Sequence, residues 1–274
     1  MAAETQAEPR NNPSMSTLAF FGTELRIRRE EAGLTQQQVA DGSLCSRTLL
    51  AHIEQARRVP SEEFAARADA VLETGGFFAR LWPLVMEYAY PKWFRRFVDL
   101  EKDATEIWNF ENQVVPGLLQ TEDYAQALFA AARVANTDDL VAARLTRQQL
   151  LEKDKRPRLW TALDENVLRR PVGSRVVMRR QLERLVEATE DRRIIVQVIP
   201  YNVGAHASMD GPFAGLALAE GPGIVYVDGR ARGQILADEA SVEEYRYTYD
   251  LLRADALSPR ASIDLISAVA KELS

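Results

Sequence analysis

The chain of 274 residues contains a single cysteine, Cys45, so no disulfide can form within it. Such a chain suits a reducing compartment, and we expect the protein in the cytoplasm. No stretch approaches the roughly 18 consecutive apolar residues of a membrane span. The polar N-terminus also lacks the basic start and apolar run of a secretory signal. We therefore expect no association with a membrane.

Histidine is also scarce, because the chain has only His52 and His206. The common catalytic and nucleotide-binding patterns are absent: no G-x-S-x-G, H-E-x-x-H, P-loop or G-x-G-x-x-G follows an expected strand. A metal site would need several histidine, cysteine or carboxylate ligands that converge. The sequence therefore predicts no enzyme, no cofactor and no metal.

Basic residues are fewer than acidic ones, with 34 Lys and Arg against 40 Asp and Glu, so the formal net charge is −6. This counts mildly against nucleic-acid binding, because neutralising phosphates favours basic surfaces. The distribution is more informative than the total: between Phe21 and Pro60 there are six arginines and five acids. One copy of this segment should bind DNA weakly, and a homodimer would strengthen the binding.

Composition and periodicity divide the chain into three parts. Residues 1–15 are rich in Pro, Asn, Gln and small side chains, which is typical of a disordered tail. Helical patterns fill residues 16–88, and Tyr90-Pro91 marks a linker. Residues 92–274 mix helical and strand patterns. The expected fold class is thus multidomain, with an all-α five-helix domain followed by an α+β domain with a mixed sheet.

The expected elements can be given as ranges. In the first domain we expect helices at 18–32, 36–41, 47–55, 61–72 and 77–86, with Thr35 and Ser46 as N-caps. In the second domain we expect strands at 105–111, 158–163, 194–199, 213–219 and 224–227. The expected helices there are 121–132, 138–153, 174–190, 239–256 and 259–273.

The second and third helices of the first domain have the pattern of a helix-turn-helix. Val39 and Ala40 can pack the second helix onto the first. Either Leu49 or Leu50, together with Ile53, turns one side of the third helix toward the core. The N-terminal half of such a helix is presented to the major groove. Its outer face would then hold Arg47, Thr48, Ala51 and His52.

Four positions on the second and third helices suit contacts with double-stranded DNA. Arg47 can bind a guanine through two hydrogen bonds, Thr48 offers a hydroxyl or a methyl group, and His52 can reach a base or a phosphate. Gln36 begins the second helix, where its side chain and backbone N–H groups can meet a phosphate. We therefore expect direct base reading by the third helix.

Two further arginines, Arg57 and Arg58, follow the third helix and can bind phosphates of the DNA backbone. A two-fold dimer would place two recognition helices about one DNA turn apart and would bind a near-palindromic operator. The alternative is that the first domain is only a bundle of packed helices with arginines and glutamines as a solvated surface.

This segment resembles the XRE-type (lambda-repressor-like) helix-turn-helix family. The resemblance implies that Gln36, Arg47, Thr48 and His52 occupy the usual DNA-contact positions. Leu44 and Ala56 stand where the family usually has Gly, which tolerates a positive φ, so we expect a slightly remodelled turn. The matching residues are Leu25-Arg26, Arg29, Gly33-Leu34-Thr35-Gln36, Val39-Ala40, Ser46, Ile53-Glu54, Arg58 and Pro60-Ser61.

Six segments of the second domain occur together in a fixed order: VVPGLLQTEDYAQALF, RLTRQQLL, ALDENVLRRPVG, QVIPYNVGAHASMDGPF, IVYVD and YDLLRADALSP. They resemble the C-terminal domain of the actinobacterial WhiJ-like regulators. That domain has no settled activity, and genes of the family often neighbour one for a small partner protein, a pair described as antitoxin-like and toxin-like.

Several residues of the second domain are candidates for binding a ligand or partner. Trp108 and Trp160 lie in expected strands and line either a pocket or the core. His206 and Asp210 belong to a long loop after a strand, and Glu165 near another strand end can join them in space. The alternative for His206 is a polar loop residue that stabilises turns.

The two resemblances together imply a sequence-specific DNA-binding transcription regulator whose second domain senses a ligand or binds a small protein. The alternative function is an antitoxin-like protein that neutralises the product of a neighbouring gene and binds DNA for autoregulation.

Overall fold

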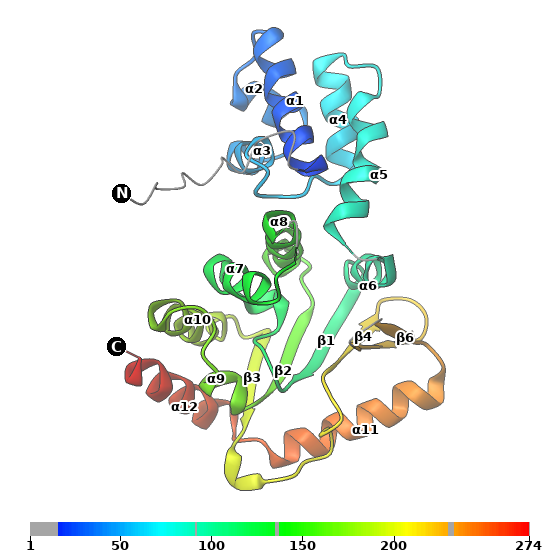
Figure 1. Cartoon of the computed structure of the whole chain (residues 1–274). Coiled ribbons are helices and arrows are strands. Elements are labelled where there is room, and N and C mark those ends of the chain that lie inside the picture. The colour runs from blue at the N-terminus through cyan, green and yellow to red at the C-terminus, as the bar shows by residue number, and fades with distance from the viewer. Residues whose placement is uncertain (1–15, 91, 135–136, 230–232, 274) are drawn as a thin grey trace, which may run out of the picture. The chain divides into compact units, whose positions relative to one another are not determined.

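The computed structural model describes residues 16–90, 92–134, 137–229 and 233–273, so the expected tail at 1–15 lies outside the described residues. The chain forms two compact units (Figure 1). The first comprises Met1–Pro91 with Ala132–Thr146, and the second comprises Lys92–Ala131 with Arg147–Ser274. The second unit is therefore interrupted in the chain, whereas the expected second domain was the continuous range 92–274.

Five helices make up the N-terminal part of the first unit. Serine or threonine side chains cap four of them by accepting a backbone N–H, and the predicted caps Thr35 and Ser46 are confirmed. Thr35 forms a reciprocal capping box with Gln38. The helices are α1 (Thr17–Glu31), α2 (Gln36–Gly42), α3 (Arg47–Glu54), α4 (Glu62–Leu72) and α5 (Phe77–Ala89).

The core of this unit forms where α1, α2 and α3 cross. Leu50 is fully buried while Leu49 is only half-buried, which settles the choice between the two. A Cβ atom at Gly22 would lie 2.5 Å from the carbonyl oxygen of Ile53, so α1 and α3 approach too closely for any larger residue. The other fully buried side chains here include Phe21, Leu25, Val39 and Ala40.

A sixth helix of the first unit comes from much later in the chain. Helix α8 (Thr137–Gln148) is shorter than the expected helix at 138–153, because a 3-10 turn, Gln149–Glu152, follows it. Its residues up to Thr146 belong to the first unit. Val141, Ala142 and Ala143 are almost completely buried. Helix α8 is thus part of the packing of the first unit.

The second unit is built on one six-stranded sheet with the order β3-β2-β1-β4-β5-β6. β1, β2 and β3 run parallel, and β4, β5 and β6 continue the sheet antiparallel from β1, so the predicted mixed sheet is confirmed. The strands are β1 (Ala104–Glu111), β2 (Arg158–Asp164), β3 (Ile194–Ile199), β4 (Phe213–Leu218), β5 (Ile224–Val227) and β6 (Gln234–Leu236).

Helices cover both faces of this sheet (Figure 1). α11 (Glu239–Asp255) packs on one face, and the other helices of this unit lie on the opposite face. Alternation along β1 sends Ile107 to the second face and Trp108 toward α11. The sequence did not predict α6, α9 or β6. The remaining helices are α6 (Lys92–Glu101), α7 (Glu122–Ala131), α9 (Asn166–Arg169), α10 (Arg175–Ala188) and α12 (Pro259–Glu272).

None of the helices in the described part of the chain combines the length and the apolar character that crossing a membrane requires.

Candidate nucleic-acid interface

Helix α3 presents a polar outer side at its N-terminal end. Ser46 caps this end by accepting a hydrogen bond from the N–H of Leu49. Arg47 and Thr48 are exposed, and their side chains form no hydrogen bond or ion pair with any other described residue. His52, one turn further on, is half-buried. Arg47 and Thr48 are therefore available to a ligand at the position where the sequence placed the reading residues.

Gln36 lies at the first position of α2, as expected, but its side chain has a partner within the protein. Its Nε2 donates to Oε2 of Glu54 at 2.8 Å. Glu54 belongs to α3, and its carboxylate is only 3% exposed. The N–H of Gln38 donates to Oγ1 of Thr35, whereas the N–H of Gln36, at the first helical position, has no acceptor within the helix. This N–H is the group of Gln36 that suits a phosphate.

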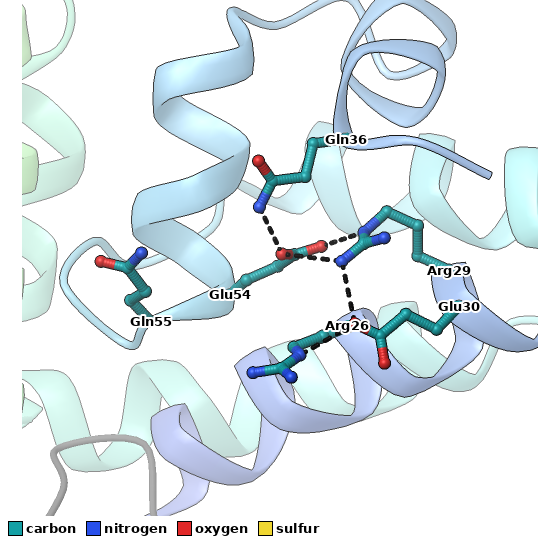
Figure 2. A pocket seen from close by; sticks show the side chains of 6 residues that line it. All are labelled: Arg26, Arg29, Glu30, Gln36, Glu54 and Gln55. Atoms are coloured by element: carbon teal, nitrogen blue, oxygen red, sulfur yellow. Dashed lines mark hydrogen bonds and ion pairs between the residues drawn. The ribbon is translucent and has the colours of Figure 1, made fainter.

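Arg29 of α1 completes this cluster (Figure 2). Its Nε donates to Oε1 of Glu54 at 2.5 Å, and its Nη1 donates to the carbonyl oxygen of Leu34 at 3.1 Å. The hydrogen bond to Glu54 raises the pKa of the Arg29 guanidinium. The buried carboxylate thus links α1, the start of α2 and the end of α3. It fixes α2 and α3, the two helices of the helix-turn-helix, relative to each other.

A cavity of about 250 Å³ lies beside this cluster (Figure 2). Charge on its walls is balanced internally, because Arg26 donates to Glu30 at 3.0 Å and Arg29 pairs with Glu54. The ion pair with Arg26 lowers the pKa of Glu30. The lining residues are Arg26, Arg29, Glu30, Gln36, Glu54 and Gln55.

The turns on both sides of α3 keep the left-handed backbone that Gly usually supplies. Leu44 has a φ of 53° and Ala56 a φ of 56°. The expectation of a remodelled turn is therefore wrong. The backbone adopts the left-handed conformation at both residues, although each has a Cβ atom that makes this conformation strained. Leu44 is 74% exposed, so packing does not compensate for this cost.

The loop after α3 carries the two arginines that we expected to grip a DNA backbone. Arg57 is exposed, and Nη1 of Arg58 donates to the carbonyl oxygen of Arg57 at 2.9 Å. The next two residues are anchored. The N–H of Val59 donates to Oγ1 of Thr146, and the carbonyl oxygen of Pro60 accepts from Nε1 of Trp82, each at 2.9 Å.

The two tryptophans proposed for a pocket in the second unit belong to the packing between the sheet and α11. Trp108 is 3% exposed and packs against Tyr249, with ring centroids 5.2 Å apart. A Cβ at Gly215 would lie 2.0 Å from the Trp108 ring. Trp160 donates from Nε1 to Gln197 at 2.8 Å, and its ring lies under the guanidinium of Arg253. The alternative of core packing fits these contacts.

The loop candidates are engaged in local hydrogen bonds. Nε2 of His206 lies 3.3 Å from Oδ2 of Asp164, and its Nδ1 accepts the N–H of Ser208. The proton therefore lies on Nε2, which donates to Asp164. The hydroxyl of Ser208 donates to the carbonyl oxygen of Gly211 at 2.8 Å, and it lies 3.3 Å from Oδ1 of Asp210. The contact with Asp164 ties the loop to the end of β2, and the bonds of Ser208 lie within the loop.

Glu165 lies next to Asp164 but has different partners. Its Oε1 accepts from Nε of Arg169 at 3.1 Å, and its Oε2 accepts the N–H of Tyr201 at 3.0 Å. Among the residues that the structure describes, no three His, Cys, Asp or Glu side chains are grouped so that they could hold a metal ion. Glu165 and His206 therefore bind different partners, Arg169 and Tyr201 in the first case and Asp164 in the second.

Comparison with known protein families gives two matches. Residues 21–76 match a helix-turn-helix domain, and residues 94–268, more than half of the chain, match a domain of unknown function, DUF5753. The chain belongs to the DUF5753 family. No curated protein and no solved structure matches the chain. The N-terminal match supports a DNA-binding regulator, and the activity of the DUF5753 domain is not known.

The DUF5753 match includes α8, although the residues of α8 up to Thr146 pack in the unit that contains the helix-turn-helix. Sequence reasoning missed this placement. It also missed the pairing of Arg29 with Glu54, because these residues are 25 positions apart and no periodicity relates them. Arg29 and Glu54 both match the helix-turn-helix pattern, and this match could have pointed to their pairing. Nothing in the sequence identified Asp164 as the partner of His206.

Proposed function

We propose that this protein is a sequence-specific transcription regulator of the XRE type that binds double-stranded DNA inside the cytoplasm. The observation that carries the proposal is the pair Arg47 and Thr48 at the start of α3, which are exposed and form no hydrogen bond or ion pair with another described residue. Gln36 and the Arg29–Glu54 pair support it, because they fix the geometry of α2 and α3. His52, Arg57 and Arg58 extend the surface along and beyond α3.

The direct test is selection of binding sites from a random duplex library with the full-length chain. Arg47→Ala should lose about 1–3 kcal/mol on the selected site and little on random DNA, if Arg47 binds a guanine through two hydrogen bonds. Arg67→Ala is the matched control, because Arg67 lies on α4 and pairs with Glu63 one turn away. Failure of the wild-type chain to enrich any sequence would refute the proposal.

We further propose that it binds a near-palindromic operator as a homodimer. The near balance of charge between Phe21 and Pro60 supports this, because one copy supplies little phosphate neutralisation. Phe20 and Ile27 on α1 and Leu84 on α5 are large apolar side chains exposed on the same unit. Light scattering should report a dimer, at least with operator present, and a monomer in both conditions would exclude it.

For the DUF5753 domain we propose a binding role, either for a small ligand or for a small protein, without catalysis or a cofactor. His206 supports this, because both of its ring nitrogens are occupied by Asp164 and by the backbone of Ser208. A hydrolase or transferase activity that Asp164→Asn abolishes in the purified chain would contradict it.

The antitoxin-like function of WhiJ-like regulators is the second candidate. Tyr247 and Leu251, one turn apart on α11, are both exposed, as are Tyr201 and Met209 in the loop region after β3. Such side chains suit a protein partner. The product of a neighbouring gene should co-purify with the wild-type chain and be lost from the double variant Tyr247→Ser, Leu251→Ser. Absence of a complex with the wild-type chain argues against this role.

A further inference from the structure

The loop that follows the recognition helix is fixed by a residue from far along the chain. The N–H of Val59 donates to Oγ1 of Thr146 at 2.9 Å, across 87 positions of sequence. Val59 is 4% exposed, so water cannot readily replace this acceptor. Arg57 and Arg58 lie immediately before it. The backbone that carries these two arginines is therefore held by α8.

The Thr146 hydroxyl both donates and accepts a hydrogen bond in this arrangement. It donates its hydrogen to the carbonyl oxygen of Ala142 at 2.8 Å, one turn back in α8. This donation orients a lone pair of Oγ1 toward the N–H of Val59. A valine at position 146 would keep the shape of the side chain and lose the acceptor. A serine would keep the acceptor.

Two further contacts set the position of α8 within the first unit. The hydroxyl of Ser16, which caps α1, donates to Oδ1 of Asp139 at 2.8 Å. The hydroxyl of Tyr90, at the end of α5, donates to the carbonyl oxygen of Ala143 at 2.8 Å. With these contacts at its start and middle, α8 holds Thr146 in a defined place relative to α1 and α5.

We propose that Thr146 is a positioning residue of the DNA interface, and that α8 is the part of the DUF5753 sequence through which that domain takes part in DNA binding. The proposal rests on the proposed regulator function. A fixed loop loses less conformational freedom when Arg57 and Arg58 bind phosphates. Because phosphate contacts carry no base information, releasing the loop weakens binding to every sequence by a similar factor.

The test compares full-length Thr146→Val and Thr146→Ser with the wild-type chain by two measurements. The first is hydrogen exchange of the Val59 amide, which should become about tenfold faster in Thr146→Val and stay unchanged in Thr146→Ser. The second is affinity for a selected duplex and for random duplex. Thr146→Val should bind both about threefold to tenfold more weakly, and Thr146→Ser should bind as the wild type does.

Three results would overturn the proposal. Unchanged exchange of the Val59 amide in Thr146→Val shows that the hydroxyl does not hold the loop. Faster exchange with unchanged affinity limits Thr146 to a structural role. A loss of affinity for the selected duplex alone would show that Thr146 supports the base contacts and not the phosphate contacts. If the wild-type chain binds no duplex at all, the regulator function itself fails, which is distinct from equal binding by wild type and Thr146→Val.

Discussion

The guanidinium of Arg29 donates hydrogen bonds to both carboxylate oxygens of Glu54, from Nε at 2.5 Å and from Nη2 at 3.3 Å. Both side chains are largely buried, with 12% and 3% of their surfaces exposed. A pair of this kind is costly to break from one side, because the remaining charge is left in the interior. Removing only one partner should therefore destabilise the helix-turn-helix far more than replacing both partners by apolar side chains.

Replacing Arg29 by Met should destabilise the first unit by about 3–5 kcal/mol, because Glu54 then remains buried without its cation. The double variant Arg29→Met, Glu54→Leu should recover most of that loss. Denaturant unfolding followed by circular dichroism measures both. Arg26→Met is the matched control, since Arg26 pairs with Glu30 on the surface and should change stability little. Equal, small effects of all three would show that the pair is not buried in solution.

Leu44→Gly should stabilise the first unit by about 0.5–1 kcal/mol, because Gly removes the left-handed strain while little packing is lost. Leu44→Ala keeps the Cβ atom and the strain, so its melting temperature should stay close to that of the wild type. The comparison of the two variants by thermal denaturation isolates the backbone term. A lower melting temperature for the Gly variant would show that the exposed leucine side chain contributes to folding.

Arg57→Ala should weaken binding to selected and random duplexes by a similar factor, because a phosphate contact is insensitive to sequence. The slope of log affinity against log salt concentration should fall by about 1. Titrations at several salt concentrations by fluorescence anisotropy measure this slope. A loss of preference for the selected site would assign Arg57 to a base instead.

Asp139 should make the first unit less stable as the pH rises from acidic to neutral. Burial raises the pKa of its carboxyl above the ordinary value of 3.8, and the hydrogen bond from Ser16 opposes this only in part. Above 3.8 the folded state therefore binds more protons than the unfolded state, so this residue's contribution to stability falls with increasing pH. Oδ2 of Asp139 also has no hydrogen-bond partner among the described residues.

Asp139→Asn removes that titration and still accepts the hydrogen bond from Ser16. Its free energy of unfolding should exceed that of the wild type at neutral pH, and the difference should shrink as the pH falls toward 3.8. Asp41→Asn is the charge-matched control, because Asp41 is exposed. A difference that is constant with pH would place the ionised carboxylate in water and not in the packing of α8.

The local features of this protein follow from patterns in its amino-acid sequence. Side-chain caps at Thr35 and Ser46 start α2 and α3, since a hydroxyl next to an apolar helical pattern satisfies the first N–H groups. Period-two and continuous apolar patterns located five of the six strands. The outer position of Arg47 and Thr48 follows from helical periodicity once Leu50 and Ile53 face the core.

The long-range pairings depend on how the chain folds in three dimensions. Gln36 and Arg29 meet at Glu54, His206 meets Asp164, and Val59 meets Thr146, each across many residues of chain. No periodicity encodes such contacts, because they arise when a buried polar group must find a partner and the fold brings one within reach. For the same reason the sequence assigned α8 to the second domain, whereas its buried face and its Thr146 hydroxyl complete the first unit.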